Sequence, residues 1–341
     1  MKIKKILAAL LASALVLTSF AACGGGKNEA GTDGKPAKVV IGTQQMPNDE
    51  GIAKALNYFE DEMGVKVEIQ SFDSGADVNT ALASGDIDFG LYGSCPVAIA
   101  ISNDIGVEFI WIHEVLGSVE SLVARKETGI TKIEDLVGKT VATPFASTAH
   151  FSILKALENA GIADKVNLIS MTTAEIVAAW ELGQIDAAYI WEPTLSQLDN
   201  KVTVITSEDC AKAGYMTSNI EVVRTEFAQK YPEVVASYIK AVSKAVDLYK
   251  NDQASAVSAI AKFMDLSEDD ALFQMSGSTW LTASEQLGAD YLGTSDAKGA
   301  IVDNLYETAL FLKDQGSLTS VPDKSAFEAA VNPKYIEMSL K

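Results

Sequence analysis

The sequence predicts an α/β protein built as two lobes with a ligand cleft between them, and three observations support this fold class. Short apolar strands alternate with amphipathic helices from Lys38 to about Ile205. The alternation forms two series that share one sequence pattern, at 84–88 and at 182–186. In each, a helix ends at a glycine and an aspartate leads into the next strand. After Val223 only helices are expected, so the C-terminal part completes the first series.

The first series starts at Lys38 and alternates strands and helices in the manner of a parallel sheet. Apolar residues at helical spacing, including Ile52, Leu56 and Phe59, predict one amphipathic helix over 49–63. Pro96 suits the first turn of another helix. We expect strands at 38–43, 65–71, 87–91 and 107–112, and helices at 49–63, at 96–102 and over a stretch that ends near residue 82.

The second series follows a segment at 121–124 that carries the chain out of the first lobe, and a strand at 220–223 returns it. These two crossings predict a discontinuous first lobe, 38–122 and 223–341, with a second lobe, 123–222, inserted into it. We expect strands at 139–142, 166–170, 186–190 and 202–205, helices at 149–160, 174–182 and 193–198, and C-terminal helices at 232–249, 252–263, 268–275 and 297–315.

The N-terminus has the features of an export signal. A basic start with Lys2, Lys4 and Lys5 precedes an apolar stretch at 6–17 that is too short for a permanent membrane span. The sequence at 20–23, Phe-Ala-Ala-Cys, resembles a bacterial lipoprotein box, which predicts a signal peptide at 1–22 and lipidation of Cys23. The polar, glycine-rich segment 23–37 is expected to be a flexible tether. We therefore expect a protein anchored at the outer face of the cytoplasmic membrane; a soluble secreted protein is the alternative.

Composition excludes several classes of function. The chain has 27 basic and 46 acidic residues, a net charge of −19, which argues against nucleic-acid binding and makes any anion site a local construction. Its 48% hydrophobic residues suffice for the cores of two domains. The two histidines lack the spacing of metal ligands, so we expect no metal and no cofactor. Cys95 and Cys210 are interpreted as unpaired, although the sequence leaves their pairing open.

Two strand-to-helix junctions are the candidate binding elements. In 140–157, a strand leads through Pro144 to a helix that Ser147 or Thr148 can cap, with His150 beside them. In 86–100, a strand ends at a glycine, and Ser94 follows. Helix starts offer free N–H groups and the positive end of a dipole, and ligands sit at the carboxyl ends of parallel strands. The two junctions are therefore expected to face each other across one anion-binding cleft.

Three stretches together resemble the taurine/sulfonate/nitrate substrate-binding proteins of ABC importers. They are FDSGADVNTALASGDIDFGLYGSCPVAIA, ATPFASTAHFSILKALENAGI and AAWELGQIDAAYIWEP, and the resemblance covers roughly 38–315. Within that family, FDSGA, GSxP, PFxSTxH and WLT are similar to the taurine-binding subgroup. The resemblance implies a type II periplasmic-binding-protein fold and delivery of a small ligand to a membrane permease.

The site residues follow from position and from this resemblance. For the anion end we expect Ser94, Ser147, Thr148, His150 and Gln44, with Cys95 as a buried neighbour. The resembled subgroup uses an aspartate on the returning strand, and alignment puts the uncharged Asn219 there. We therefore expect Glu192 and Trp191 to help Asn219 recognise an amine, through charge and cation–π attraction.

The expected function is capture of taurine or a similar small sulfonate by a lipid-anchored, monomeric binding protein. One alternative keeps the binding role and changes the ligand to another alkanesulfonate or a nitrogenous, thiamine-pyrimidine-like precursor. A second alternative is an enzyme of the thiamine-pyrimidine synthase type, since the implied fold also hosts that chemistry. The two histidines and the export signal favour capture over catalysis.

Overall fold

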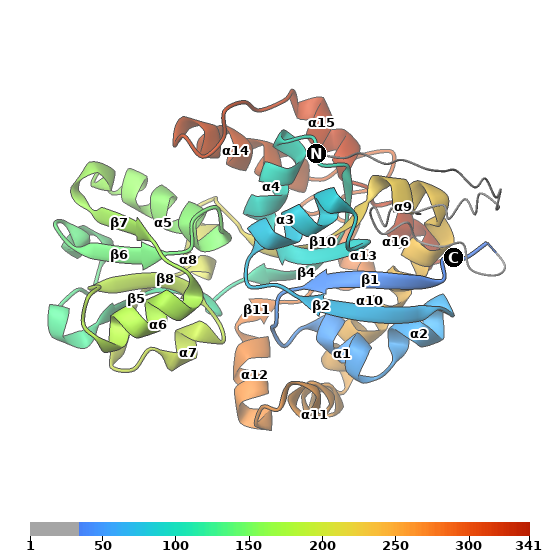
Figure 1. Ribbon diagram of the computed structural model, residues 1–341, viewed down its shortest axis with the longest axis horizontal. Coiled ribbons are helices and arrows are strands. Elements are labelled where there is room, and N and C mark those ends of the chain that lie inside the picture. Colours follow the sequence, from blue (N-terminus) through green and yellow to red (C-terminus); the bar gives the residue numbers. More distant parts are fainter. Residues whose placement is uncertain (1–33) are drawn as a thin grey trace, which may run out of the picture.

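The computed structural model describes residues 34–341 and has two α/β lobes, as the sequence predicts (Figure 1). The predicted signal peptide, Cys23 and nearly all of the predicted tether lie outside the described residues. None of the helices between residues 34 and 341 is both long and apolar enough to cross a membrane.

Lobe 1 is built on a six-stranded sheet in the order β11-β4-β10-β3-β1-β2. Strands β1, β2 and β3 are parallel, whereas β10 returns from lobe 2 and pairs antiparallel with both β3 and β4. The strands are β1 (Lys38–Thr43), β2 (Lys66–Ser71), β3 (Phe89–Gly93), β4 (Val107–Leu116), β10 (Ser218–Arg224) and β11 (Ser278–Thr279).

Helices cover both faces of this sheet, with α3 and α4 on one side and α1, α2 and α11 on the other (Figure 1). The C-terminal helices pack on this lobe: α14 packs on α4, and α10 packs on α1 and α2. The helices are α1 (Asp49–Ala55), α2 (Tyr58–Met63), α3 (Gly75–Ser84), α4 (Ser94–Ser102), α9 (Thr225–Lys230), α10 (Pro232–Asn251), α11 (Gln253–Met264), α12 (Glu268–Ser276), α13 (Ala283–Gln286), α14 (Ile301–Asp314), α15 (Lys324–Ala330) and α16 (Lys334–Ser339).

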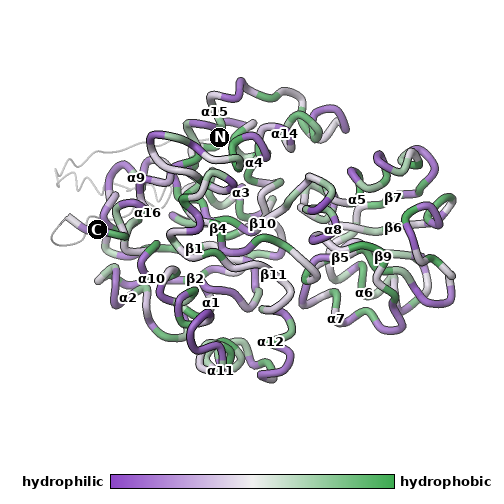
Figure 2. Tube along the Cα trace, turned by 180° about the vertical axis from the view of Figure 1, so that it is seen from behind, coloured by the Kyte–Doolittle hydropathy of each residue, from purple (hydrophilic) through white to green (hydrophobic). Residues whose placement is uncertain are grey.

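Lobe 2 is built on a five-stranded sheet in the order β7-β6-β8-β5-β9, in which β5 is antiparallel to both of its neighbours. Hydrophobic residues concentrate on the strands of both lobes and hydrophilic residues on the outer helices and loops (Figure 2). The elements are β5 (Glu120–Arg125), β6 (Thr140–Thr143), α5 (Thr148–Asn159), β7 (Asn167–Ser170), α6 (Thr173–Glu181), β8 (Ala187–Trp191), α7 (Thr194–Gln197), β9 (Lys201–Thr206) and α8 (Ser207–Lys212), with short 3-10 turns at Lys126–Thr128, Ile133–Leu136 and Ala163–Lys165.

The chain crosses between the lobes earlier than the expected boundaries after residues 122 and 222. Strand β4 continues to Leu116 and β5 already begins at Glu120, so the first crossing is 117–119. Gly117 starts it; a side chain there would meet the carbonyl oxygen of Gly277 at 2.3 Å, so this tight passage requires a glycine. The second crossing, 213–217, lies between α8 and β10.

The helix expected over 49–63 is instead two helices, α1 and α2. Helix α1 ends at Ala55, and Asn57 takes a left-handed φ of 58° that no continuous α-helix contains. The apolar spacing continues through the break, because both helices bury the same side against α10. Periodicity alone therefore could not reveal it.

Candidate functional site

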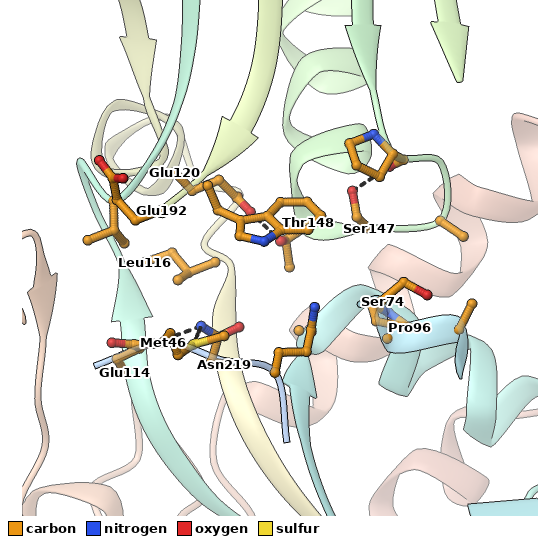
Figure 3. Close-up of a pocket in the computed structure, with 18 of the residues that line it drawn as sticks. Met46, Ser74, Pro96, Glu114, Leu116, Glu120, Ser147, Thr148, Glu192 and Asn219 are labelled. Atoms are coloured by element: carbon orange, nitrogen blue, oxygen red, sulfur yellow. Dashed lines mark hydrogen bonds between the residues drawn. The ribbon is translucent and has the colours of Figure 1, made fainter. Parts of the chain in front are cut away.

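A cavity lies between the two lobes, at the ends of strands from both sheets (Figure 3). About 710 Å³ of space lies within it, part of which is open to solvent. Lobe 1, lobe 2 and the first crossing all contribute to its lining. The lining residues are Gln44, Met46, Pro47, Ser74, Gly75, Ala76, Gly93, Pro96, Glu114, Leu116, Asn219 and Gln274 from lobe 1, Val119 from the crossing, and Glu120, Pro144, Phe145, Ala146, Ser147, Thr148, Trp191 and Glu192 from lobe 2.

The start of helix α3 contributes backbone donors to the cavity. Ser74 caps this helix: its hydroxyl accepts from the Asp77 N–H at 3.3 Å and donates to the Asp77 carboxylate at 2.6 Å. The N–H groups of Gly75 and Ala76, in the first turn, have no carbonyl four residues back within the helix. Both residues line the cavity, so this helix start is suited to an anion.

The start of helix α5 has the same arrangement on lobe 2. Ser147 caps it by accepting from the His150 N–H at 3.1 Å, and its own proton goes to the Pro144 carbonyl at 2.6 Å. The Thr148 hydroxyl donates to the carboxylate of Glu120. Both hydroxyl protons are therefore used within the protein, which differs from the expectation that one of the two would bind the ligand directly. The free donors at this helix start are backbone N–H groups.

His150 lines the loop rather than the cavity. Its Nδ1 accepts from the N–H of Ala146 at 3.3 Å, and its ring stacks on Phe145 with centroids 4.1 Å apart. Ala146 has a left-handed φ of 61°, and the bond to His150 helps to hold this unfavourable conformation. Burial lowers the pKa of His150 to about 4, so at neutral pH its Nδ1 is free to accept.

Ser94 and Cys95 lie behind the lining, whereas their neighbours Gly93 and Pro96 form it. The Ser94 hydroxyl accepts from the N–H of Ser218 at 3.3 Å and thereby ties α4 to the start of β10. Cys95 is buried in an apolar contact between the lobes with Phe151 and Phe311, and neither Cys95 nor Cys210 forms a disulfide. Ser94 and Cys95 therefore do not line the cavity, although the sequence predicts that both contact or adjoin the ligand.

The remaining predicted site residues all line the cavity, but the carboxylate of Glu192 already has hydrogen-bond partners within the protein. Its carboxylate accepts from the N–H and the hydroxyl of Ser196, at 3.0 and 2.9 Å, at the start of α7. Gln44, Trp191 and Asn219 line the cavity directly. Asn219 donates its amide N–H to Glu114 Oε1 at 2.8 Å and lies 3.1 Å from the sulfur of Met46, which leaves its amide oxygen without a partner among the described residues.

Glu114 and Glu120 are cavity residues that sequence reasoning missed. They are 4% and 1% exposed, and burial raises the pKa of each to about 7. Glu114 accepts from Asn219, and Glu120 accepts from Thr148 and, at 2.9 Å, from Ser207. The available signal was an acidic residue in the apolar stretch 107–116, which the prediction ended at residue 112.

The cavity lining carries three glutamates and, within residues 34–341, no lysine or arginine. An anion there can be held by helix-start N–H groups, whereas the buried carboxyl groups need a cation or a proton. The arrangement therefore fits a ligand with a negative end and a positive end better than a simple anion.

A second group of polar residues lies in the core of lobe 1. Glu50, His113 and Glu221 offer oxygen and nitrogen atoms within 4.8 Å of one another, which a metal ion could use. His113 Nε2 is 2.8 Å from Glu221 Oε2, however, a hydrogen-bond distance, so a metal would have to displace protons from existing bonds. We therefore interpret the contact between His113 and Glu221 as a hydrogen bond and not as part of a metal site.

Two α/β lobes that enclose a small cavity at their crossing segments define the class of bilobal substrate-binding proteins. Residues 37–264 match the family described as the substrate binding domain of ABC-type glycine betaine transport systems. The "Taurine-binding periplasmic protein" of Escherichia coli is 36% identical over 291 residues, 83% of this chain and 88% of that protein. The chain therefore belongs to this family of substrate-binding proteins of ABC transport systems.

Solved structures agree on the fold. The alkanesulfonate-binding protein SsuA from Xanthomonas axonopodis pv. citri, bound to MOPS, superimposes with a TM-score of 0.70 at 20% identity, covering 87% of this chain and 98% of that one. This confirms the predicted type II periplasmic-binding-protein fold. The desulfurization enzyme DSZB has a TM-score of 0.62 at 16% identity, covering 89% of this chain and 99% of that one, so this fold occurs in binding proteins and in an enzyme.

Proposed function

We propose that this chain is an extracytoplasmic, lipid-anchored substrate-binding protein that binds taurine or a similar small sulfonate between its lobes and delivers it to an ABC permease. The observation that carries the ligand assignment is the contrast within one cavity. Helix-start N–H groups from both lobes offer donors to an anion, and buried carboxyl groups offer acceptors to a cation. Similarity to the taurine-binding protein supports the same ligand class.

The sulfonate would bind between the starts of α3 and α5. Gly75 and Ala76 at the start of α3 on lobe 1, and Ser147 and Thr148 at the start of α5 on lobe 2, line the same cavity. Both helices have at least ten residues, so their dipoles reinforce these donors. Gln44, whose amide N–H makes only a 3.5 Å contact with the Asp73 carbonyl, is a further donor from lobe 1.

The ammonium group would bind at the opposite end, against Glu114 and Asn219. The Asn219 amide oxygen is free to accept, and the Glu114 carboxylate supplies the charge that the asparagine lacks. Trp191 adds an aromatic face on lobe 2. This assignment favours Glu114 over Glu192, because both oxygens of the Glu192 carboxylate already accept hydrogen bonds from Ser196.

Ligand contacts on both lobes favour the closed arrangement, and the permease would recognise that arrangement. No bond is made or broken in this process. A thiamine-pyrimidine synthase type of enzyme would need a reactive histidine or lysine; His113 is buried in the core, His150 holds a loop, and the described lining contains no lysine. Binding of another alkanesulfonate or of a nitrogenous precursor stays an alternative that the next experiment separates.

Titration calorimetry with taurine, isethionate, ethanesulfonate and a thiamine-pyrimidine precursor tests the proposal. Isethionate replaces the amine of taurine with a hydroxyl, so the pair isolates the ammonium contact. We expect taurine to bind about tenfold or more tightly than isethionate, which corresponds to about 1.4 kcal/mol. Equal affinities for taurine and isethionate would show that the protein does not recognise the amine. Preference for the pyrimidine precursor would exclude sulfonate capture.

The lipid anchor has its own test, which does not depend on the ligand. Wild-type protein expressed with its leader should be recovered in the membrane fraction, and the Cys23→Ser variant should become soluble. Wild-type protein found unmodified in the culture medium would exclude the anchor.

A further inference from the structure

Three chain segments form the proposed ammonium site, and each continues into the same buried group of side chains. Met46 precedes the start of α1, Glu114 follows His113 on β4, and Asn219 lies two residues before Glu221 on β10. We call the residues behind the site the buried cluster: Asp49, Glu50, His113, Glu221 and Tyr238, all at most 1% exposed.

His113 is the centre of the buried cluster. Its Nδ1 lies 2.6 Å from Asp49 Oδ1, and its Nε2 lies 2.8 Å from Glu221 Oε2. Burial alone would lower the pKa of His113, but the two carboxylates raise it well above 6.5. Donation from both ring nitrogens, as an imidazolium, would satisfy both carboxylates, and the ring joins α1 to β10 through β4.

The other hydrogen bonds in the buried cluster also run toward Asp49 and Glu221 as acceptors. The Tyr238 hydroxyl lies 2.9 Å from Glu50 Oε2 and 2.7 Å from Glu221 Oε2, and its single proton can serve only one of them. A proton retained on Glu50 satisfies the other contact, in agreement with burial and the nearby Glu221 raising the pKa of Glu50 to about 8. Trp111 Nε1 donates to Asp49 Oδ2 at 2.8 Å, so Asp49 and Glu221 are the two acceptors on which the donors converge.

Regular strand pairing does not by itself fix this region. The pairing of β10 with β4 shifts register between Asn219 and Ile220 and again between Glu221 and Val222. A bulge of this kind redirects side chains, and its position depends on side-chain contacts as well as on the ladder. The bonds of His113 and Glu221 lie at this irregular stretch and brace it from behind.

We propose that His113 is a positioning residue of the ammonium site: clamped between Asp49 and Glu221, it holds the segments of Met46, Glu114 and Asn219 so that their polar atoms converge. This inference rests on the proposed function, because it presupposes an amine-bearing ligand. It predicts that the cluster governs selectivity between amine and hydroxyl, and that the helix starts at the sulfonate end do not depend on it.

The experiment compares His113→Gln with Glu108→Gln as a matched control. Glu108 is also a buried acid on β4, bonded to Tyr335 at 3.1 Å and to Asn332, but it lies outside the cavity lining. We expect His113→Gln to weaken taurine binding by about tenfold while isethionate binding changes by less than about twofold. Glu108→Gln should leave the taurine-to-isethionate ratio unchanged.

A parallel loss for both ligands in His113→Gln, or no loss for either, would overturn the inference. If the wild type itself does not distinguish the two ligands, the proposed ammonium site fails instead. Nitrogen-15 NMR of the wild type gives a second test that needs no variant, because the chain has only two histidines. His113 should carry protons on both ring nitrogens at pH 8 and His150 on one; a neutral His113 would overturn the inference even if His113→Gln does not fold.

Discussion

Besides Glu192, the cavity has a buried carboxyl group on each wall, Glu114 on lobe 1 and Glu120 on lobe 2, and these two are satisfied by different partners. Glu114 accepts from the amide of Asn219 and lies beside His113 of the buried cluster. Glu120 accepts from the hydroxyls of Thr148 and Ser207. Burial gives both groups a pKa of about 7, so their partners, rather than their burial, distinguish them.

The difference teaches that the two walls have different roles. On lobe 1, the Glu114 carboxyl group and the free amide oxygen of Asn219 both line the cavity, an arrangement that suits a cation. On lobe 2, Glu120 anchors the first residue of α5 and the first residue of α8 to the start of β5. We therefore expect Glu114 to determine ligand selectivity and Glu120 to hold the anion-binding helix start in place.

The largest expected effect is on the stability of the ligand-free protein with pH. Glu50, Glu114 and Glu120 have folded-state pKa values of about 8, 7 and 7, well above the usual 4.5, so the folded state keeps protons that the unfolded state releases. Stability should therefore fall as pH rises from about 5 to 8. The raised pKa of His113 acts in the same direction, whereas the lowered pKa of His150 opposes it below its ordinary value of 6.5. Chemical denaturation should show a loss on the order of 5 kcal/mol between pH 6 and pH 8.

A ligand-free protein that is equally stable or more stable at pH 8 would contradict this account of the buried carboxyl groups. Saturating taurine supplies the control, because an ammonium group beside Glu114 favours its ionised form. The loss of stability between pH 6 and pH 8 should then be smaller.

The second effect separates the two carboxyl groups by ligand binding. Glu114→Gln removes the charge that faces the ammonium group and should weaken taurine binding by about 1.5–3 kcal/mol, while isethionate binding stays nearly constant. Glu120→Gln should weaken both ligands alike, because it loosens the start of α5 that the sulfonate contacts. Titration calorimetry on the two variants makes the comparison; a loss restricted to taurine in Glu120→Gln would reverse the assignment of the two walls.

The third effect concerns the hydroxyl partners of Glu120. Thr148→Val keeps the shape of the side chain but removes the donor, leaving a buried carboxyl group with only Ser207. We expect a loss of about 1–3 kcal/mol in the free energy of unfolding at pH 8, measured by urea denaturation. At pH 5 the loss should shrink, because Glu120 is then protonated and no longer charged. An effect that does not change with pH would assign it to packing alone.

The smallest effect is expected at the helix cap. Ser147→Ala removes the acceptor for the His150 N–H and should cost about 1 kcal/mol in stability. Its effect on ligand binding should be small, since the Ser147 proton goes to the Pro144 carbonyl and not to the cavity. Ser74→Ala, at the corresponding cap on lobe 1, is the matched control. A large loss of affinity in Ser147→Ala alone would restore the direct ligand role expected from the sequence.

The sequence by itself predicted the α/β class and the two lobes, and six of the candidate residues line the cavity: Gln44, Ser147, Thr148, Trp191, Glu192 and Asn219. Strand alternation and helix caps are local patterns, and the ends of parallel strands meet at one edge for topological reasons, so such features can be read without coordinates.

Only the tertiary structure decided which atoms of those residues are free. The hydroxyl protons of Ser147 and Thr148 and the carboxylate of Glu192 are taken by Pro144, Glu120 and Ser196. Glu114 became a site residue because β4 extends beyond the expected end and a β10 residue, distant in sequence, brings an amide to it. Hydrogen bonds between distant segments depend on packing that no local pattern encodes, and here they underlie the proposed division of the cavity into an anion end and a cation end.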